Sequence, residues 1–164
     1  GEVMGIAPSF GLAFYKAQVS AGGKPPLSGK VLITVSDKSK DAIMPVAQKL
    51  DQLGFDIVAT EGTSAFLTKN KVKNTLIHKI DEGRPNIVDA IKNGELNLII
   101  NTPIGKESKI DDSYIRMMAI QRKIPYVTSV AAAEATVEGI AAVRQGDISP
   151  CSLQELYAEH YANV

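Results

Sequence analysis

The chain has 164 residues, of which 45% are hydrophobic and 22% are charged, a composition typical of one globular, soluble domain. Lys plus Arg and Asp plus Glu both number 18, so the formal net charge is zero, and neither nucleic acid nor a membrane surface is an expected partner. No apolar run is long enough for a membrane span, and no signal peptide is visible. Because the single Cys151 excludes an intrachain disulfide, we expect a reducing, cytoplasmic setting.

The first expected element is a helix at residues 9–21, with Phe10 and Phe14 along one side. Residues 22–26 read Gly-Gly-Lys-Pro-Pro, and this segment ends the helix as a linker. The composition changes on either side of the linker. We therefore expect a boundary after residue 26 and one α/β domain at residues 27–164.

An alternating series of strands and helices follows the linker. Residues 30–35 (Lys-Val-Leu-Ile-Thr-Val) form an apolar run, as expected for a strand buried on both faces. Because Pro45 lacks an N–H group, the next helix is expected to begin near Lys40 or to be kinked at the proline. Ser152 and Glu155 have the spacing of a capping box at the last helix. Further strands are expected at residues 55–59, 75–80, 96–101 and 125–128, and further helices at 63–69, 87–93, 112–122, 131–144 and 152–161.

This alternation predicts an open, mainly parallel five-stranded sheet with helices on both faces, which is a three-layer α/β/α fold of the Rossmann type. Ligands of such folds bind at the carboxyl ends of the strands, near the point where the strand order reverses. The residues directly after each strand are therefore the first candidates for a functional site.

The most informative of these junctions is residues 56–63 (Asp-Ile-Val-Ala-Thr-Glu-Gly-Thr). A β-branched run ends at Thr60, and a helix opens near Thr63, so two hydroxyls and the free N–H groups of a helix start come together as in a phosphate site. Lys40, one turn into its helix, and Lys79, at the end of the third strand, would add two ammonium groups. The alternative is that both threonines only cap the helix.

The sequence carries only weak signals for metal binding, dinucleotide binding or catalysis. His78 and His160 have no Cys or carboxylate neighbours at ligand spacing, so no metal site is expected. Neither a GxGxxG nor a Walker sequence follows the first strand, and no Ser–His pair is evident. Asp37 is the best candidate for a general base. We therefore expect a binding module without catalytic residues or a cofactor of its own.

Four motifs resemble the methylglyoxal-synthase-like domain family: residues 32–38, 59–63, 82–87 and 99–102 follow its order and spacing. Within this family, the chain resembles the C-terminal regulatory domain of the carbamoyl-phosphate synthetase large subunit. Glu-Gly-Arg-Pro-Asn-Ile, followed by Ile-Lys-Asn-Gly-Glu and Ile-Ile-Asn-Thr, carries that resemblance. Residues 1–26 resemble the end of the preceding ATP-grasp region, with its helix and linker.

The resemblance implies that the complete enzyme is an ATP-dependent ligase. It would make carbamoyl phosphate from glutamine-derived ammonia, bicarbonate and two ATP, with Mg or Mn, for pyrimidine and arginine biosynthesis. Its partners would be the rest of the large subunit and a glutaminase small subunit. The C-terminal domain would carry no chemistry and would bind allosteric effectors: UMP, IMP or ornithine.

The resemblance also assigns roles to residues. The effector phosphate would be held by Lys40, Thr60, Thr63 and Lys79. The nucleotide would meet Asn101 and Thr102 near its base or ribose, and ornithine would contact Tyr126 and Thr128 at the interface with the synthetase body. Pro103 departs from the nucleotide-binding pattern of Asn-Thr-Thr, so one contact would be lost or passed to Thr102.

Two other functions stay open. A methylglyoxal-synthase-like lyase acting on dihydroxyacetone phosphate would need a catalytic aspartate in the loop at residues 82–85, where this chain has Arg84 near that place. A guanidinium group cannot abstract a proton from the substrate. A purely structural domain that helps the parent protein to assemble is the third hypothesis.

Overall fold

The computed structural model describes residues 2–102, 109–146, 148, 150 and 152–161. Its centre is an open sheet in the order β3-β2-β1-β4-β5, in which every neighbouring pair is parallel. This confirms the predicted five-stranded sheet. The strands are β1 (Lys30–Val35), β2 (Asp56–Ala59), β3 (Thr75–Leu76), β4 (Leu98–Thr102) and β5 (Tyr126–Val127).

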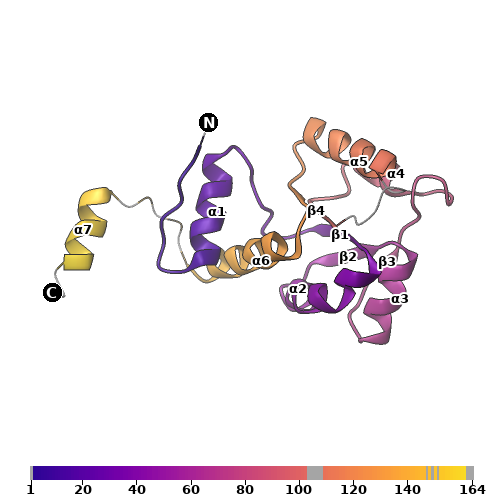
Figure 1. The fold of residues 1–164 in the computed structure, drawn as a ribbon, viewed down its shortest axis with the longest axis horizontal. Coiled ribbons are helices and arrows are strands. Elements are labelled where there is room, and N and C mark those ends of the chain that lie inside the picture. Colours follow the sequence, from indigo (N-terminus) through magenta and orange to yellow (C-terminus); the bar gives the residue numbers. More distant parts are fainter. Residues whose placement is uncertain (1, 103–108, 147, 149, 151, 162–164) are drawn as a thin grey trace.

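Helices cover both faces of the sheet. The described helices are α1 (Phe10–Ser20), α2 (Lys40–Gln52), α3 (Glu61–Lys69), α4 (Ile87–Lys92), α5 (Lys109–Gln121), α6 (Val130–Gln145) and α7 (Leu153–Tyr161), with a short 3-10 turn, η1 (Asp37–Ser39), before α2. Figure 1 shows the strands with α2 and α3 on one side and α4 and α5 on the other. Ile33 and Ile100 pack with α2, α3 and α6, whereas Leu32 and Ile99 pack with α4 and α5. Alternate residues of each strand thus face opposite layers, which gives the predicted three-layer arrangement.

Several element boundaries differ from the predicted ones, among them those of α3 and β3. α3 begins at Glu61 rather than near residue 63, because Thr60 has the extended backbone of an N-cap. β3 ends at Leu76 instead of residue 80, because His78 leaves β2 and pairs with Asn86. α2 begins at Lys40, as predicted, and continues through Pro45.

α1 packs against α6, but not through the side that its phenylalanines suggest. Phe10 is 72% exposed, and the buried residues of α1 are Gly11 and Tyr15. The Tyr15 hydroxyl donates a hydrogen bond to the carbonyl oxygen of Pro25 at 3.0 Å, and burial raises the pKa of Tyr15.

The domain boundary expected after residue 26 stays a prediction, because a helix that packs on α6 can belong to either side of that boundary. Within the described ranges, no helix is both long and apolar enough to cross a membrane.

The closest approach of α1 and α6 is where two glycines meet. A Cβ atom on Gly139 would lie 2.5 Å from the carbonyl oxygen of Gly11 and 2.8 Å from Tyr15 Cβ. Neither atom is the flexible end of a side chain, so a methyl group there would push the helices apart.

We predict that Gly139→Ala lowers the free energy of unfolding by about 1–2 kcal/mol, because overpacking costs about 1–3 kcal/mol and outweighs the helix propensity gained. Chemical denaturation measures the change. Gly146→Ala is the control, since a Cβ there would have no neighbour within 4 Å among the residues that the structure describes. Unchanged or increased stability of Gly139→Ala would contradict the close crossing.

Candidate functional site

Polar side chains line the carboxyl edge of the sheet across four neighbouring strands. We call Thr60, Thr34, Asn101 and Tyr126 the polar row. The Thr60 hydroxyl donates to Thr34 Oγ1 at 3.1 Å, and Asn101 Nδ2 donates to the Tyr126 hydroxyl at 2.7 Å. Thr34 and Asn101 are partners in the register of β1 and β4. The row therefore crosses the boundary between β1 and β4, where the strand order reverses.

The start of α3 is tied to β1 by one buried threonine. Thr63 Oγ1 accepts a hydrogen bond from the Val35 N–H group at 3.3 Å and donates to the Val35 carbonyl oxygen at 3.4 Å. Thr60 is the N-cap residue of α3, but its side chain makes no capping hydrogen bond because it turns to Thr34. The first-turn N–H groups of α3 are therefore left without the usual side-chain acceptor.

Lys40 places an ammonium group beside this helix start. A Cβ atom on Gly62 would lie 3.4 Å from Lys40 Nζ, and the Lys40 side chain is only 19% exposed. Its partner is Asp37, whose Oδ1 lies 2.7 Å from Nζ. The hydrogen bond from Lys40, and then its positive charge, lower the pKa of Asp37. A cation and a helix N-terminus, both positive, thus meet at one point.

Lys79 follows β3 at the same edge, but its described contacts stay within its own loop. Its side chain is 57% exposed, and its ammonium group lies 3.4 Å from Glu82 Oε1. Glu82 Oε2 also accepts from the backbone N–H group of Lys79. In the same loop, Arg84 pairs with Asp89 at 3.8 Å. The structure therefore brings Lys40, Thr60 and Thr63 together and leaves Lys79 at the margin.

The other end of the polar row is a cluster around Asn101, which is almost fully buried. Asn101 Nδ2 donates to Asp112 Oδ1 at 2.9 Å as well as to Tyr126. The Arg116 guanidinium lies 5.6 Å from the centre of the Tyr126 ring. Burial, mainly, and then the charge of Asp112 raise the pKa of Tyr126, although the hydrogen bond from Asn101 opposes them.

The remaining predicted residues differ in their surroundings. Thr102 is buried beside Asn101 at the end of β4, and its hydroxyl has no hydrogen-bond partner within the described part of the chain. Thr128, after β5, is exposed. Pro103 and Cys151 lie outside the described residues, as does the side chain of His160. Among the residues that the structure describes, no group of three His, Cys, Asp or Glu side chains could hold a metal ion.

Sequence reasoning missed Thr34, Asp112 and Arg116. Thr34 carried a signal, because it is a polar residue in an apolar run and comes just before the end of β1. Asp112 and Arg116 lie on α5, and only the packing of that helix against β4 and β5 brings them to the edge.

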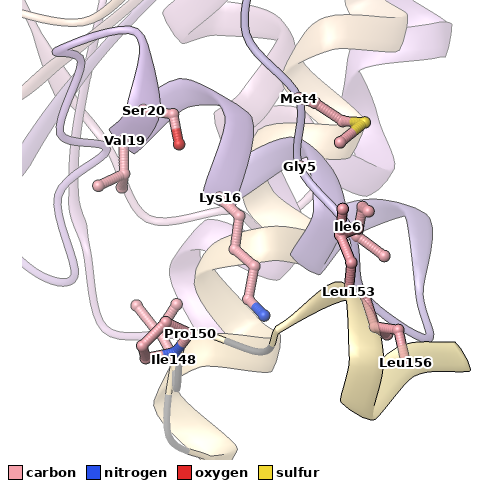
Figure 2. A pocket seen from close by; sticks show the side chains of 10 residues that line it. All are labelled: Met4, Gly5, Ile6, Lys16, Val19, Ser20, Ile148, Pro150, Leu153 and Leu156. Atoms are coloured by element: carbon pink, nitrogen blue, oxygen red, sulfur yellow. The ribbon is translucent and has the colours of Figure 1, made fainter. Parts of the chain in front are cut away.

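A separate cavity of about 500 Å³ lies between residues 4–6, α1 and α7 (Figure 2). Figure 2 shows apolar side chains around it, and the tip of the Lys16 side chain lies in this view between Pro150 on one side and Leu153 on the other. Most of its lining is apolar, with Lys16 and Ser20 as the polar side chains, so it suits an apolar group better than an anion. It is lined by Met4, Gly5, Ile6, Lys16, Val19, Ser20, Ile148, Pro150, Leu153 and Leu156.

The chain is thus an open parallel α/β domain that brings an ammonium group, hydroxyls and an uncapped helix start together at the carboxyl edge of its sheet. The family model described as "MGS-like domain" matches residues 42–128 of the sequence. The chain therefore belongs to this family. The predicted family is thereby confirmed.

Curated relatives match almost the whole chain. It is 45% identical over 158 residues to the "Carbamoyl phosphate synthase large chain, C-terminal section" of Methanopyrus kandleri, covering 96% of this chain and 29% of the relative. It is 49% identical over 160 residues to the "Carbamoyl phosphate synthase large chain" of Acidobacterium capsulatum, covering 98% and 15%. The C-terminal section from Aquifex aeolicus is 46% identical, with 96% and 30% covered. The chain thus spans between about one seventh and one third of these relatives.

Among solved structures, the chain is similar to one titled "Crystal structure of ForH", at a TM-score of 0.47 and 16% identity, with 83% of this chain and 92% of that one covered. At this TM-score the likeness supports no conclusion about the site.

We predict that Thr63→Val lowers the free energy of unfolding by about 1–3 kcal/mol without any ligand, because the Val35 N–H group loses its acceptor inside the edge. Thermal unfolding should register a fall of about 2–4 °C per kcal/mol. Thr128→Val, at an exposed position, is the matched control and should change little. Equal stability of Thr63→Val and the wild type would mean that the hydroxyl does not hold α3 to β1.

Proposed function

We propose that this chain is the C-terminal effector-binding domain of a carbamoyl phosphate synthase large chain. It binds a nucleoside monophosphate of the UMP or IMP class and carries no chemistry itself. The complete enzyme would be the ATP-dependent ligase that makes carbamoyl phosphate for pyrimidine and arginine biosynthesis. Support comes from relatives of that name, which are 45–49% identical over at least 96% of the chain.

The observation that carries effector binding is the position of Lys40 beside the first turn of α3. Two positive groups in contact are unfavourable until an anion lies between them. Asp37 supplies one such negative charge from an exposed position. A phosphate dianion could instead accept hydrogen bonds from the Lys40 ammonium and the first-turn N–H groups of α3 at once.

The polar row favours a nucleotide over inorganic phosphate. Thr60 follows β2, and Asn101 lies on β4, with β1 between them. Two strand spacings of about 4.8 Å each separate these positions, a span that ribose and base can cover once the phosphate is bound at α3. Asn101 and Thr102 would then meet the base or ribose, and Lys79 would approach the phosphate from the margin.

No described contact favours the lyase. Glu82 is engaged by the Lys79 ammonium and backbone, and Arg84 by Asp89. A lyase would need a base in the loop at residues 82–85. There, Glu82 is paired within the loop and Arg84 is paired with a residue of α4. Asp37, the best candidate from the sequence, is paired with Lys40.

The remaining parts of the proposal concern the parent enzyme. Ornithine is a further candidate effector at Tyr126 and Thr128, which lie at the β5 end of the edge. The partners would be the rest of the large chain and a glutaminase small subunit, and ATP with Mg or Mn would bind elsewhere in the enzyme. A cytoplasmic location follows from that biosynthetic role.

Thermal unfolding with UMP and IMP tests the proposal. At 100 times its Kd a nucleotide should stabilise the chain by about 2.7 kcal/mol, which is a rise in Tm of about 5–10 °C. Lys40→Ala should abolish the rise because it removes the phosphate partner. Lys49→Ala, exposed in the last turn of the same helix, should retain it.

Two results would count against this function. One is the absence of a shift with either nucleotide at millimolar concentration. The other is release of methylglyoxal from dihydroxyacetone phosphate above the background rate in a colorimetric assay, which would favour the lyase.

A further inference from the structure

The segment Ile-Lys-Asn-Gly-Glu at residues 91–95 ends α4 and takes no part in the polar row or in the start of α3. Asn93 is the only asparagine of the sequence that is followed by glycine. In such a pair the backbone nitrogen of the glycine can attack the side-chain carbonyl carbon of the asparagine, because no side chain shields that nitrogen. Asn93 and Gly94 are both exposed, so access of water does not limit the reaction.

The end of α4 requires this glycine. Gly94 has a φ of +70°, a left-handed conformation that residues with a side chain rarely adopt. Its N–H group donates to the Ile91 carbonyl oxygen at 3.1 Å, and the Glu95 N–H group donates to the Ala90 carbonyl oxygen at 3.0 Å. These two hydrogen bonds form a Schellman motif, a common helix ending that has glycine at this position. The geometry that ends the helix therefore places a glycine directly after Asn93.

The same motif holds Asn93 in a conformation that cannot react. Attack closes a five-membered ring, for which the Gly94 nitrogen must lie on the side-chain side of the Cα–C bond of Asn93. Asn93 has a ψ of −5°, so the Gly94 nitrogen is instead eclipsed with the backbone nitrogen of Asn93. Rotation toward the side chain would break both hydrogen bonds of the Schellman motif. The last turn of α4 must therefore open before the pair can react.

The side chain of Asn93 is the first link of a chain of three polar side chains. Its Nδ2 donates to Glu95 Oε1 at 3.1 Å, and Glu95 Oε2 lies 3.3 Å from Lys30 Nζ. The hydrogen bond from Asn93, and then the hydrogen bond and charge of Lys30, lower the pKa of Glu95. These contacts join the end of α4 to the first residue of β1. Conversion of the Asn93 amide into an acid would put a second carboxylate beside Glu95 and remove this link.

We propose that Asn93 is a site of spontaneous deamidation, and that the Schellman motif at the end of α4 protects it in the folded chain. When this turn opens, the Gly94 nitrogen loses its proton and forms a bond to Cγ of Asn93, and the side-chain nitrogen leaves as ammonia. Water then opens the resulting succinimide at either carbonyl group, which gives aspartate or isoaspartate at position 93. Isoaspartate adds a carbon atom to the backbone, so the helix can no longer end in the same way. This inference does not depend on the proposed function.

Peptide mass spectrometry of the 164-residue chain, incubated at mildly alkaline pH, tests the inference. The measured quantity is the fraction of the peptide containing Asn93 in which an acid has replaced the amide. The folded chain should react at least tenfold more slowly than the chain unfolded in guanidinium chloride. In the unfolded chain, Gly94→Ala should slow the reaction severalfold, because the added methyl group shields the attacking nitrogen.

Two variants of the folded chain show whether the protection is local. Ile91→Val trims a fully buried side chain in the last turn of α4 and should speed deamidation at least threefold. Gly139→Ala weakens the crossing of α1 and α6, which pack on the opposite face of the sheet, and should leave the rate unchanged. Chemical denaturation of both variants checks that each is folded under the conditions of the incubation.

Four outcomes would overturn the inference. Equal rates in the folded and the unfolded wild type would mean that the Schellman motif gives no protection. Absence of deamidation in the unfolded chain would mean that Asn93 is not a reactive site. An unchanged rate in Ile91→Val would show that the last turn of α4 does not control the reaction. Equal acceleration by Ile91→Val and Gly139→Ala would show that the reaction requires unfolding of the whole chain.

Discussion

The parallel pairing of β1 with β2 on one side and β4 on the other is the constraint on which the site depends. It aligns Ile33 with Ala59 and with Ile100, so the carboxyl ends of three strands meet at one level. Thr34, Thr60 and Asn101 are thereby neighbours although they are far apart in the sequence. A slip of one strand by one residue would turn its polar side chain to the opposite face and break the alignment of these three residues.

The same packing explains how the positive charge of Lys40 is tolerated beside a helix start. Lys40 is mostly buried beside the start of α3, and the carboxylate of Asp37 balances its charge. The surrounding hydroxyls are already oriented by Thr34 and Val35, so little side-chain entropy remains to be lost on binding. In a parent enzyme, an effector at this edge would alter catalysis only by its differential affinity for two conformations.

Much of the fold followed from the sequence, because hydrophobic periodicity and helix caps are local signals. The apolar run at residues 30–35 is β1, and the predicted capping box is present between Ser152 and Glu155. The predictions were wrong or incomplete where contacts between distant elements determine which side chains are buried. Gly11, not Phe10, faces α6 because only glycines allow so close a crossing. In the site, Thr60 and Thr63 lie at the start of a helix, as their motif predicted. The contact of Asp112 with Asn101, by contrast, depends on how α5 packs against the sheet.

The most direct test of an anion site at this edge is residue-resolved NMR titration of the chain with UMP. We expect the backbone amide signals of Gly62 and Thr63 and the side-chain amide signals of Asn101 to shift together and to saturate at one Kd. Shifts confined to the cavity between α1 and α7, or no shifts at millimolar UMP, would contradict it.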